Sequence, residues 1–309
     1  MNALRAVGLL AVAGLLATTA SGATAPVPVK TSPRNETTPA ASGDYFAWAK
    51  SRRGRPHTLD VYAQLGTEAP VKVNARRTYG WAGGIDGTRL VYQEVSKRNS
   101  NIRFFDLTTH RRSSPQGVNT KRWEWRPTIS GDWLLFDRGA VFSGSTQQVL
   151  LRNLVTGEQR VLDSLRTKHG FLQAGQVNGN FAVWVKCVSG RCIVFRYDVT
   201  TQMTTPMPST DQVQYGPSVT TTGTTYYGRS GSECGAALEL VKTTVDGVTQ
   251  VLYSFPAGQD FGLTYATPVA IKPPSEISLT RIYFDRTVCS TERSDIYSID
   301  DLERLPPPR

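Results

Sequence analysis

The sequence lacks the short motifs on which many enzymes build their sites. It has no glycine-rich phosphate-binding loop, no G-x-G-x-x-G fingerprint and no series of Asp boxes. The segment GRSGSECG, residues 228–235, places a serine between glycines. It has neither the G-x-S-x-G order nor the following helix that a nucleophile elbow requires. A non-enzymatic protein is therefore the first interpretation, and an enzyme that assembles its site from scattered loops is the alternative.

Histidine and cysteine are also scarce. The three histidines, His57, His110 and His169, lie far apart, and the four cysteines form no C-x-x-C or Cys-His pair. Zinc sites need such clusters of nitrogen and sulfur ligands. We therefore expect neither a metal site nor another cofactor.

Long apolar runs are missing beyond the first residues. Arg5 precedes an apolar stretch over residues 6–16, and small residues follow it. The stretch is too short to cross a bilayer, so we predict a signal peptide over residues 1–23, with an uncleaved anchor as the alternative. The Pro- and Thr-rich residues 24–36 then form a flexible linker. We expect a secreted protein, extracellular or periplasmic, without transmembrane insertion after signal removal.

Helical periodicity is rare, whereas Val, Thr and aromatic residues are abundant, which favours an all-β fold. A turn followed by an aromatic strand recurs along the chain, with glycines 44 to 48 residues apart. The recurring segments are SGDYFAWA from residue 42, DGTRLVYQ from 86, SGDWLLFD from 130, NGNFAVWV from 178, TGTTYYGR from 222 and, without the glycine, SLTRIYFD from 278. Self-similarity at this period indicates an array of four-stranded units.

Each unit has the same order of segments. A strand of small residues comes first, the turn and the aromatic strand follow, and a variable loop leads to a third and a fourth, outer strand. This order predicts a β-propeller of four-stranded antiparallel blades over residues 37–309, with six blades. Five or seven blades, or a large β-sandwich, are the alternatives.

The repeat resembles that of the TolB-like propellers, whose units combine a proline, an Asp-Gly turn and an aromatic strand. The position four before the turn glycine is Pro39 or Pro127 in two units. It is Gly83 or Gly175 in two others, and the Asp-Gly order survives at residues 86–87. The resemblance implies the propeller fold and contacts with proteins of the cell envelope.

The last unit lacks a fourth strand, because the chain ends in the prolines of residues 306–308. Propellers often close by taking a strand from the other terminus. Residues 25–30, APVPVK, are the candidate, and Pro28 restricts them to the edge of a sheet.

Four cysteines in a chain that is predicted to be exported favour two disulfides. Cys187 and Cys192 flank a short loop of the fourth unit, while Cys234 and Cys289 fall in the equivalent loops of the fifth and sixth units. Among the three possible pairings we predict Cys187–Cys192 and Cys234–Cys289.

The formal net charge of +10 indicates attraction to anionic partners. In a propeller, the loops between second and third strands share one face with the connections between blades, and most cations fall in these segments. The predicted basic face includes Arg52, Arg53, Arg55, Lys97 and Arg98. The alternative is a solvated surface that only aids solubility.

Aromatic residues alternate with cations in two connections, RRTYGW at residues 76–81 and TKRWEWRP at residues 120–127. One repeat position holds Trp81, Trp125 and Tyr215, so we expect these rings to meet at the mouth of the channel, where they can stack on a ligand. The predicted ligand-binding residues are these three together with Arg77, Arg122 and Arg126. Alanine at Trp81 or Trp125 should weaken binding without unfolding; packing of the rings between blades is the alternative.

These features predict a secreted, non-enzymatic propeller that binds an anionic cell-envelope partner, either a protein or a polymer. A propeller hydrolase or lyase acting on envelope carbohydrate is the alternative, and an interaction scaffold whose charge is incidental is the third interpretation. We expect a monomer and no nucleic-acid partner.

Overall fold

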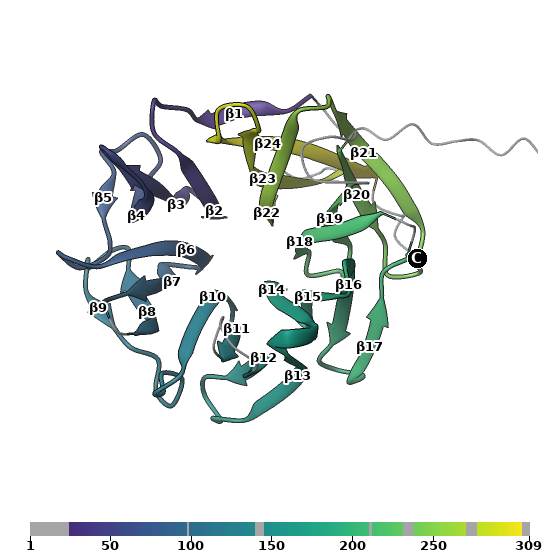
Figure 1. Cartoon of the computed structure of the whole chain (residues 1–309), viewed down its shortest axis with the longest axis horizontal. Coiled ribbons are helices and arrows are strands. Elements are labelled where there is room, and N and C mark those ends of the chain that lie inside the picture. The colour runs from purple at the N-terminus through teal and green to yellow at the C-terminus, as the bar shows by residue number, and fades with distance from the viewer. Residues whose placement is uncertain are drawn as a thin grey trace, which may run out of the picture.

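The structure is a computed structural model that describes residues 25–97, 99–139, 145–209, 212–230, 238–269 and 277–304. In this part of the chain, six four-stranded antiparallel sheets surround a central axis (Figure 1). The predicted six-bladed β-propeller is therefore confirmed.

Blades 1 to 3 follow one another along the chain, and each begins at the axis and ends at the rim (Figure 1). Blade 1 consists of β2 (Glu36–Ser42), β3 (Tyr45–Arg52), β4 (Arg55–Leu65) and β5 (Val71–Lys72). Blade 2 consists of β6 (Tyr79–Asp86), β7 (Arg89–Val95), β8 (Ser100–Asp106) and β9 (Arg112–Ser113). Blade 3 consists of β10 (Trp123–Ser130), β11 (Trp133–Gly139), β12 (Thr146–Asn153) and β13 (Gln159–Arg166).

Blades 4 to 6 complete the ring, and the 3-10 turn η1 (Thr167–His169) leads into the first of them. Blade 4 consists of β14 (Gly170–Asn178), β15 (Phe181–Val188), β16 (Arg191–Asp198) and β17 (Met203–Pro206). Blade 5 consists of β18 (Val213–Val219), β19 (Thr225–Ser230), β20 (Leu238–Thr243) and β21 (Thr249–Phe255). Blade 6 consists of β22 (Gln259–Val269), β23 (Ile277–Val288), β24 (Arg293–Arg304) and, from the other end of the chain, β1 (Val27–Lys30).

The repeated glycines form the turns between first and second strands. Gly43, Gly87 and Gly131 have φ of +54°, +57° and +54°. No atom lies within 4 Å of the place where a Cβ would stand on any of the three. Backbone conformation, rather than lack of space, therefore selects glycine at these turns.

The aromatic second strands fill the space between neighbouring blades. Trp48, Tyr92, Phe136, Trp184 and Phe284 take equivalent places in five blades and are at most 3% exposed. The clusters that contain Tyr92, Phe136, Trp184 and Phe284 combine residues of adjacent blades. Burial of these large rings therefore holds one blade against the next.

The N-terminal strand β1 closes the ring. It pairs antiparallel with β24, which gives the sheet order β1-β24-β23-β22. Lys30 then reaches blade 1, where its Nζ donates to Gln64 and lies 4.6 Å from the ring centre of Trp48. Pro28 sits on the outermost strand, where a missing N–H is tolerated. One short strand thus links the last blade to the first.

We expect removal of β1 to destabilise the whole ring. Deleting residues 1–31 should lower the free energy of unfolding by about 2–3 kcal/mol, because three paired positions are lost and each backbone hydrogen bond contributes about 1 kcal/mol. Urea unfolding measures the difference. A shorter deletion that ends at Ala25 keeps β1 and serves as the control. Equal stability of the two truncated proteins would show that β1 does not close the ring.

The hairpin of β15 and β16 carries the first predicted disulfide. Its two turn residues, Ser189 and Gly190, both have positive φ, as a type I′ turn requires. This turn sets Cys187 opposite Cys192, and the two cysteines are bonded as predicted. Cys289 is also disulfide-bonded, but Cys234 lies outside the described residues, so the pair Cys234–Cys289 stays a prediction.

Residues 1–24 lie outside the described part of the chain, so the signal peptide also stays a prediction. Among the residues that the structure describes, no helix has the length and apolar character needed to span a bilayer.

Candidate functional site

One face of the disc holds both the blade connections and the loops between second and third strands. In blade 3, Trp123 at the start of β10 lies opposite Gly139 at the end of β11. Thr146 at the start of β12 likewise lies opposite Arg166 at the end of β13, where the connection to blade 4 begins. We call this side the connection face. It is the face on which the sequence placed the candidate site.

Every innermost strand carries a β-bulge next to the axis. In β10 the bulge lies between Trp125 and Thr128, and Arg126 within it has φ +48°. Thr38 of β2 takes the same place with φ +50°. A bulge redirects a side chain that regular pleating would point elsewhere. The bulges therefore decide which side chains face the axis.

Backbones approach one another closely around the axis. A Cβ on Gly83 would lie 1.9 Å from the carbonyl oxygen of Pro127, and one on Gly175 would lie 2.4 Å from that of Pro217. No larger residue fits at these two positions. The close approach of backbones therefore explains why the first strand of each unit is rich in small residues.

A channel of about 670 Å³ opens at the axis and is lined by five of the six blades. Residues at the starts of β6, β10 and β14 contribute to it, so its mouth lies on the connection face. Its aromatic lining residues are Trp81, Trp123, Trp125, Phe171 and Tyr265. Its amide side chains come from Gln93, Gln147 and Gln173. The lining thus combines flat apolar surfaces with neutral hydrogen-bonding groups.

Three of the predicted ligand-binding residues line this channel, namely Trp81, Trp125 and Arg126. The two tryptophans differ in burial, because Trp125 is only 6% exposed whereas Trp81 is half-buried. Trp123 and Phe171 are 36% and 47% exposed and present more ring surface at the mouth. They were not among the predicted ligand-binding residues, although Trp123 lies two residues before Trp125 and Phe171 lies at the equivalent place in blade 4.

The other three predicted residues lie outside the channel lining. Tyr215 packs against the hydrophobic cluster that blades 5 and 6 share. The expected meeting of three rings is therefore limited to Trp81 and Trp125, because blade 5 turns its ring toward a neighbouring blade. Arg77 and Arg122 are exposed on the connections that lead into β6 and β10.

Two carboxylates beside the channel were not predicted. The tripeptide Phe-Asp-Arg occurs at residues 136–138 and 284–286, and it gives Asp137 and Asp285 equivalent places in blades 3 and 6. Asp285 lines the channel and accepts a hydrogen bond from Thr37 Oγ1 at 2.9 Å. The repeated tripeptide is the sequence signal for both. Within the described residues, His, Cys, Asp and Glu side chains form no group of three that could hold a metal ion.

Asp137 lies behind Arg126 and has no exposed surface. Its Oδ2 is 3.8 Å from Arg126 Nη1, and its two oxygens accept from the Ala174 N–H at 3.0 and 3.1 Å. Burial raises the pKa of Asp137 to about 7, although the charge of Arg126 and the Ala174 N–H both act to lower it. The attraction of Arg126 therefore does not compensate fully for the loss of water at Asp137.

The guanidinium of Arg126 is directed to the channel. Its side chain is 37% exposed, and the residue lines the channel wall. Among the described residues it makes the long ion pair with Asp137 and no side-chain hydrogen bond. A separation of 3.8 Å is too long for a hydrogen bond. The donors of this guanidinium are therefore left for a ligand.

Many cations of the predicted basic face have acidic partners. Arg52 forms a two-point ion pair with Asp60. Further paired cations are Lys50 with Glu36, Arg138 with Glu124, Lys186 with Asp163 and Arg229 with Glu239. All five acids lie on strands, outside the loops in which the cations were counted. The basic face is therefore weaker than the sequence suggested.

The remaining cations of that face are exposed. Arg53, Arg55 and Lys97 make no ion pair with another described residue, and Arg98 lies outside the described residues. A second exposed group occupies the three connections that lead into β6, β10 and β14; its members are Arg76, Arg77, Lys121, Arg122, Arg166 and Lys168. We call these six residues the rim cations. They stand beside the three blades that supply the channel's tryptophans and Phe171.

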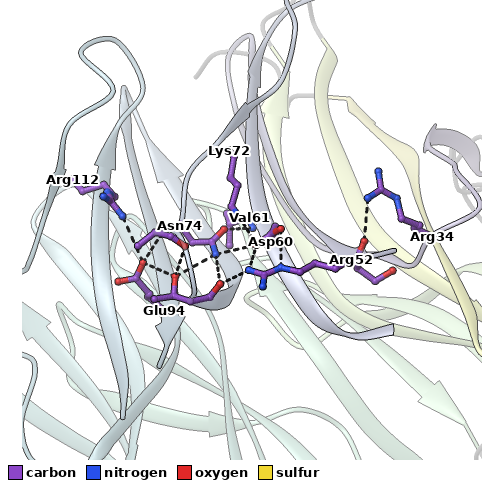
Figure 2. A network of polar contacts seen from close by, with 11 residues as sticks. Arg34, Arg52, Asp60, Val61, Lys72, Asn74, Glu94 and Arg112 are labelled. Atoms are coloured by element: carbon purple, nitrogen blue, oxygen red, sulfur yellow. Dashed lines mark hydrogen bonds and ion pairs between the residues drawn. The ribbon is translucent and has the colours of Figure 1, made fainter. Parts of the chain in front are cut away.

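A polar network anchors the first of these connections (Figure 2). Asp60 of β4 is its centre, where it accepts from Arg52 Nε at 3.0 Å and from Asn74 Nδ2 at 3.2 Å. Lys72 Nζ lies 2.9 Å from the same carboxylate. Burial alone would raise the pKa of Asp60, but the bonds from Arg52, Lys72 and Asn74 together lower it. The carboxylate therefore stays charged and holds the connection to the blade.

Asn74 and Glu94 fix the turn that follows. Asn74 accepts from the Val61 N–H at 2.9 Å and donates to the Thr78 carbonyl at 2.9 Å (Figure 2). Glu94 of the next blade accepts from the Ala75 N–H at 2.9 Å. Both ends of the turn are thus bonded, while the two arginines between Ala75 and Thr78 remain exposed.

The second connection repeats the attachment of an asparagine to the third strand of the preceding blade. Asn119 accepts from the Ile102 N–H at 2.8 Å and donates to the Ile102 carbonyl at 2.9 Å. The sequence signal is shared, because VNARR at residues 73–77 and VNTKR at residues 118–122 differ at only two positions. Two neighbouring connections therefore each carry a pair of cations after an asparagine that is bonded to the preceding blade.

Comparison with solved structures places the fold. A TolB from Agrobacterium tumefaciens has a TM-score of 0.55 at 11% identity, over 89% of this chain and 92% of that one. An oligogalacturonate lyase from Vibrio parahaemolyticus has a TM-score of 0.54 at 9% identity, over 88% of this chain and 80% of that one. The chain spans 60% of the TolB from Acinetobacter baumannii, with a TM-score of 0.48 at 14% identity over 80% of this chain. No family model and no curated protein matches the sequence.

Identities this low support a statement about the fold alone. The chain is a six-bladed propeller that distantly resembles the TolB-like propellers.

Proposed function

We propose that this protein is an exported, non-enzymatic binding module that takes an anionic partner of the cell envelope, a protein or a polymer, at the mouth of its channel. The observation that carries the proposal is the Arg126 guanidinium, which faces the channel without a hydrogen-bonded acceptor among the described residues. Guanidinium groups bind carboxylate and phosphate oxygens through two parallel N–H donors. An anionic group of the partner is the natural acceptor.

The surroundings of Arg126 suit a ligand larger than a single ion. Trp123 and Phe171 offer exposed ring faces at the mouth, and the amide of Gln173 offers a donor and an acceptor. Gln93 and Gln147 already bond within the protein. The rim cations surround this side of the mouth with positive charge. Charge of one sign around a concave site raises the rate of encounter with the opposite charge.

Export is supported by the Cys187–Cys192 bond, because disulfides persist in oxidising compartments. The extracellular or periplasmic location is part of the proposal.

We expect the rim cations to carry the salt dependence of binding. Replacing Arg77 and Arg122 together by Gln should weaken binding of polygalacturonate or poly-glutamate roughly tenfold at low salt, since exposed pairs contribute up to about 1 kcal/mol each. Screening should remove the difference in concentrated salt. Affinity measured over a range of ionic strength tests this. The control, Arg89→Gln with Arg111→Gln, removes two charges from the opposite end of blade 2, where Arg89 lies across from Asp106, and should change little.

The two polymers also separate the possible partners. A preference for poly-glutamate indicates an acidic protein, and a preference for polygalacturonate indicates an acidic polysaccharide. New reducing or unsaturated ends in polygalacturonate after incubation would favour the alternative, a hydrolase or lyase acting on envelope carbohydrate. Failure of both polymers to bind at low salt would contradict the proposed function.

A further inference from the structure

We propose that anion binding at Arg126 is coupled to proton uptake near neutral pH, and that the proton goes to the carboxylate of Asp137. This inference rests on the proposed function and adds the dependence of that site on pH. No bond other than the O–H bond of Asp137 forms, and solvent supplies the proton.

The geometry makes Asp137 a competitor of the ligand. Its carboxylate stands 3.8 Å from the Arg126 guanidinium and is fully buried, while the guanidinium faces the channel. An anion that reaches Arg126 from the channel must share this cation with a second negative charge. The repulsion between the two anions is poorly screened where water is scarce. Protonation of Asp137 removes the repulsion and leaves the whole guanidinium charge to the ligand.

Asp137 can exist in both states at neutral pH. It accepts hydrogen bonds from one backbone N–H, that of Ala174, and burial raises its pKa to about 7. Linkage between two sites is reciprocal, so an anion that binds better to the protonated form must raise the pKa of Asp137 further. The result is net proton uptake when binding occurs at or slightly above neutral pH.

The other charged groups near Asp137 either pair with another residue or lie on another blade. On β10, Glu124 is bonded to Arg138, which is the neighbour of Asp137 on β11. On β12, the residue opposite Asp137 is Val149, and β14 carries no charged residue. Asp285, on β23, also lines the channel. Arg126 is thus the cation that acts on Asp137.

One exposed histidine, which is not among the six rim cations, could also make anion binding depend on pH and must be removed. His169 is exposed in the turn that leads into β14, and histidine is the side chain that ordinarily changes charge near neutral pH. The experiment therefore uses His169→Asn as its background, so that this imidazole contributes nothing.

Sulfate is the probe, because its charge does not change in this pH range. Fluorescence of the channel tryptophans can report its affinity at about pH 5.5 and about pH 8.5. We expect affinity about tenfold higher at the acidic pH, within the usual range of coupling between two sites. Asp137→Asn keeps the acceptor for Ala174 but cannot titrate, so its affinity should stay at the acidic level at both pH values. Asp163→Asn, which removes the partner of Lys186, should keep the slope of the background protein.

Calorimetry provides a second measurement that needs no change at Asp137. Sulfate binding at about pH 7.5 in two buffers of different ionisation enthalpy should show net uptake of about half a proton for a tenfold coupling. Affinity that does not vary with pH, or a slope that survives in Asp137→Asn, would overturn the proton coupling and leave the binding site standing. No sulfate binding at either pH would overturn the assignment of the site itself.

Discussion

The Asp137→Asn variant should be more stable than the wild type at about pH 8.5, by roughly 2–4 kcal/mol. The ordinary pKa of an aspartate is close to 4, whereas burial raises the pKa of Asp137 to about 7 in the folded protein. Between these values the folded state holds a proton that the unfolded state has released. Stability therefore falls as the pH rises from about 4 to about 7, and the cost persists above that range. Asparagine does not ionise, so the Asp137→Asn variant does not lose this stability.

The two proteins should converge in acid, because Asp137 is then neutral in the folded wild type as well. Urea unfolding at several pH values gives the two curves, and their difference should grow from pH 4 to pH 7. Asp163→Asn is the matched control, since it removes a carboxylate that pairs with Lys186 at 2.8 Å near the surface. A variant Asp137→Asn that is less stable than the wild type at high pH would show that the Arg126 pair is net stabilising.

Alanine at Trp125 should cost about 3–5 kcal/mol of unfolding free energy, the usual range for a large buried ring. The indole is only 6% exposed, although part of it reaches the channel. The sequence-based expectation that Trp125→Ala spares the fold is therefore revised. Trp123→Ala and Phe171→Ala should each cost under about 1 kcal/mol, as their rings are 36% and 47% exposed.

We expect Trp123→Ala and Phe171→Ala to affect binding more than they affect stability, unlike Trp125→Ala. Stacking on an aromatic ring contributes about 1–3 kcal/mol, so Trp123→Ala and Phe171→Ala should each weaken binding of the anionic polymer without changing the melting temperature. Trp125→Phe keeps a ring in the same place and separates lost packing from lost contact. If Trp123→Ala and Phe171→Ala bind normally, the ring surface of the mouth does not serve the ligand. Trp81, which is half-buried, stays a predicted ligand contact.

The sequence by itself determined the architecture, because the architecture depends on local chemistry that is repeated. Gly43, Gly87 and Gly131 mark turns that need positive φ, and the aromatic residue five positions after each is buried. The Ser189–Gly190 turn brings Cys187 and Cys192 together without help from the rest of the molecule. Each of these features is decided within a few residues, so the linear order of the chain is sufficient to find it.

Charge pairing was decided only by the tertiary structure. Lys50 and Glu36 are 14 residues apart, and Lys186 and Asp163 are 23 apart, yet each pair is in contact. A count of loop cations cannot include acids that neighbouring strands bring to them. The six rim cations were left exposed for the same reason, since no strand of the described structure sets a carboxylate beside them.

The tertiary structure also determined which side chains line the channel. Trp81, Trp125 and Tyr215 share one repeat position, but Tyr215 packs between blades 5 and 6. Arg126 faces the axis because a bulge gives it a φ of +48°, and Asp137 lies behind it because β11 pairs with β10. A repeat position fixes the strand and the height of a side chain. The direction of that side chain, and the charge that it meets, depend on the bulge and on the neighbouring blade.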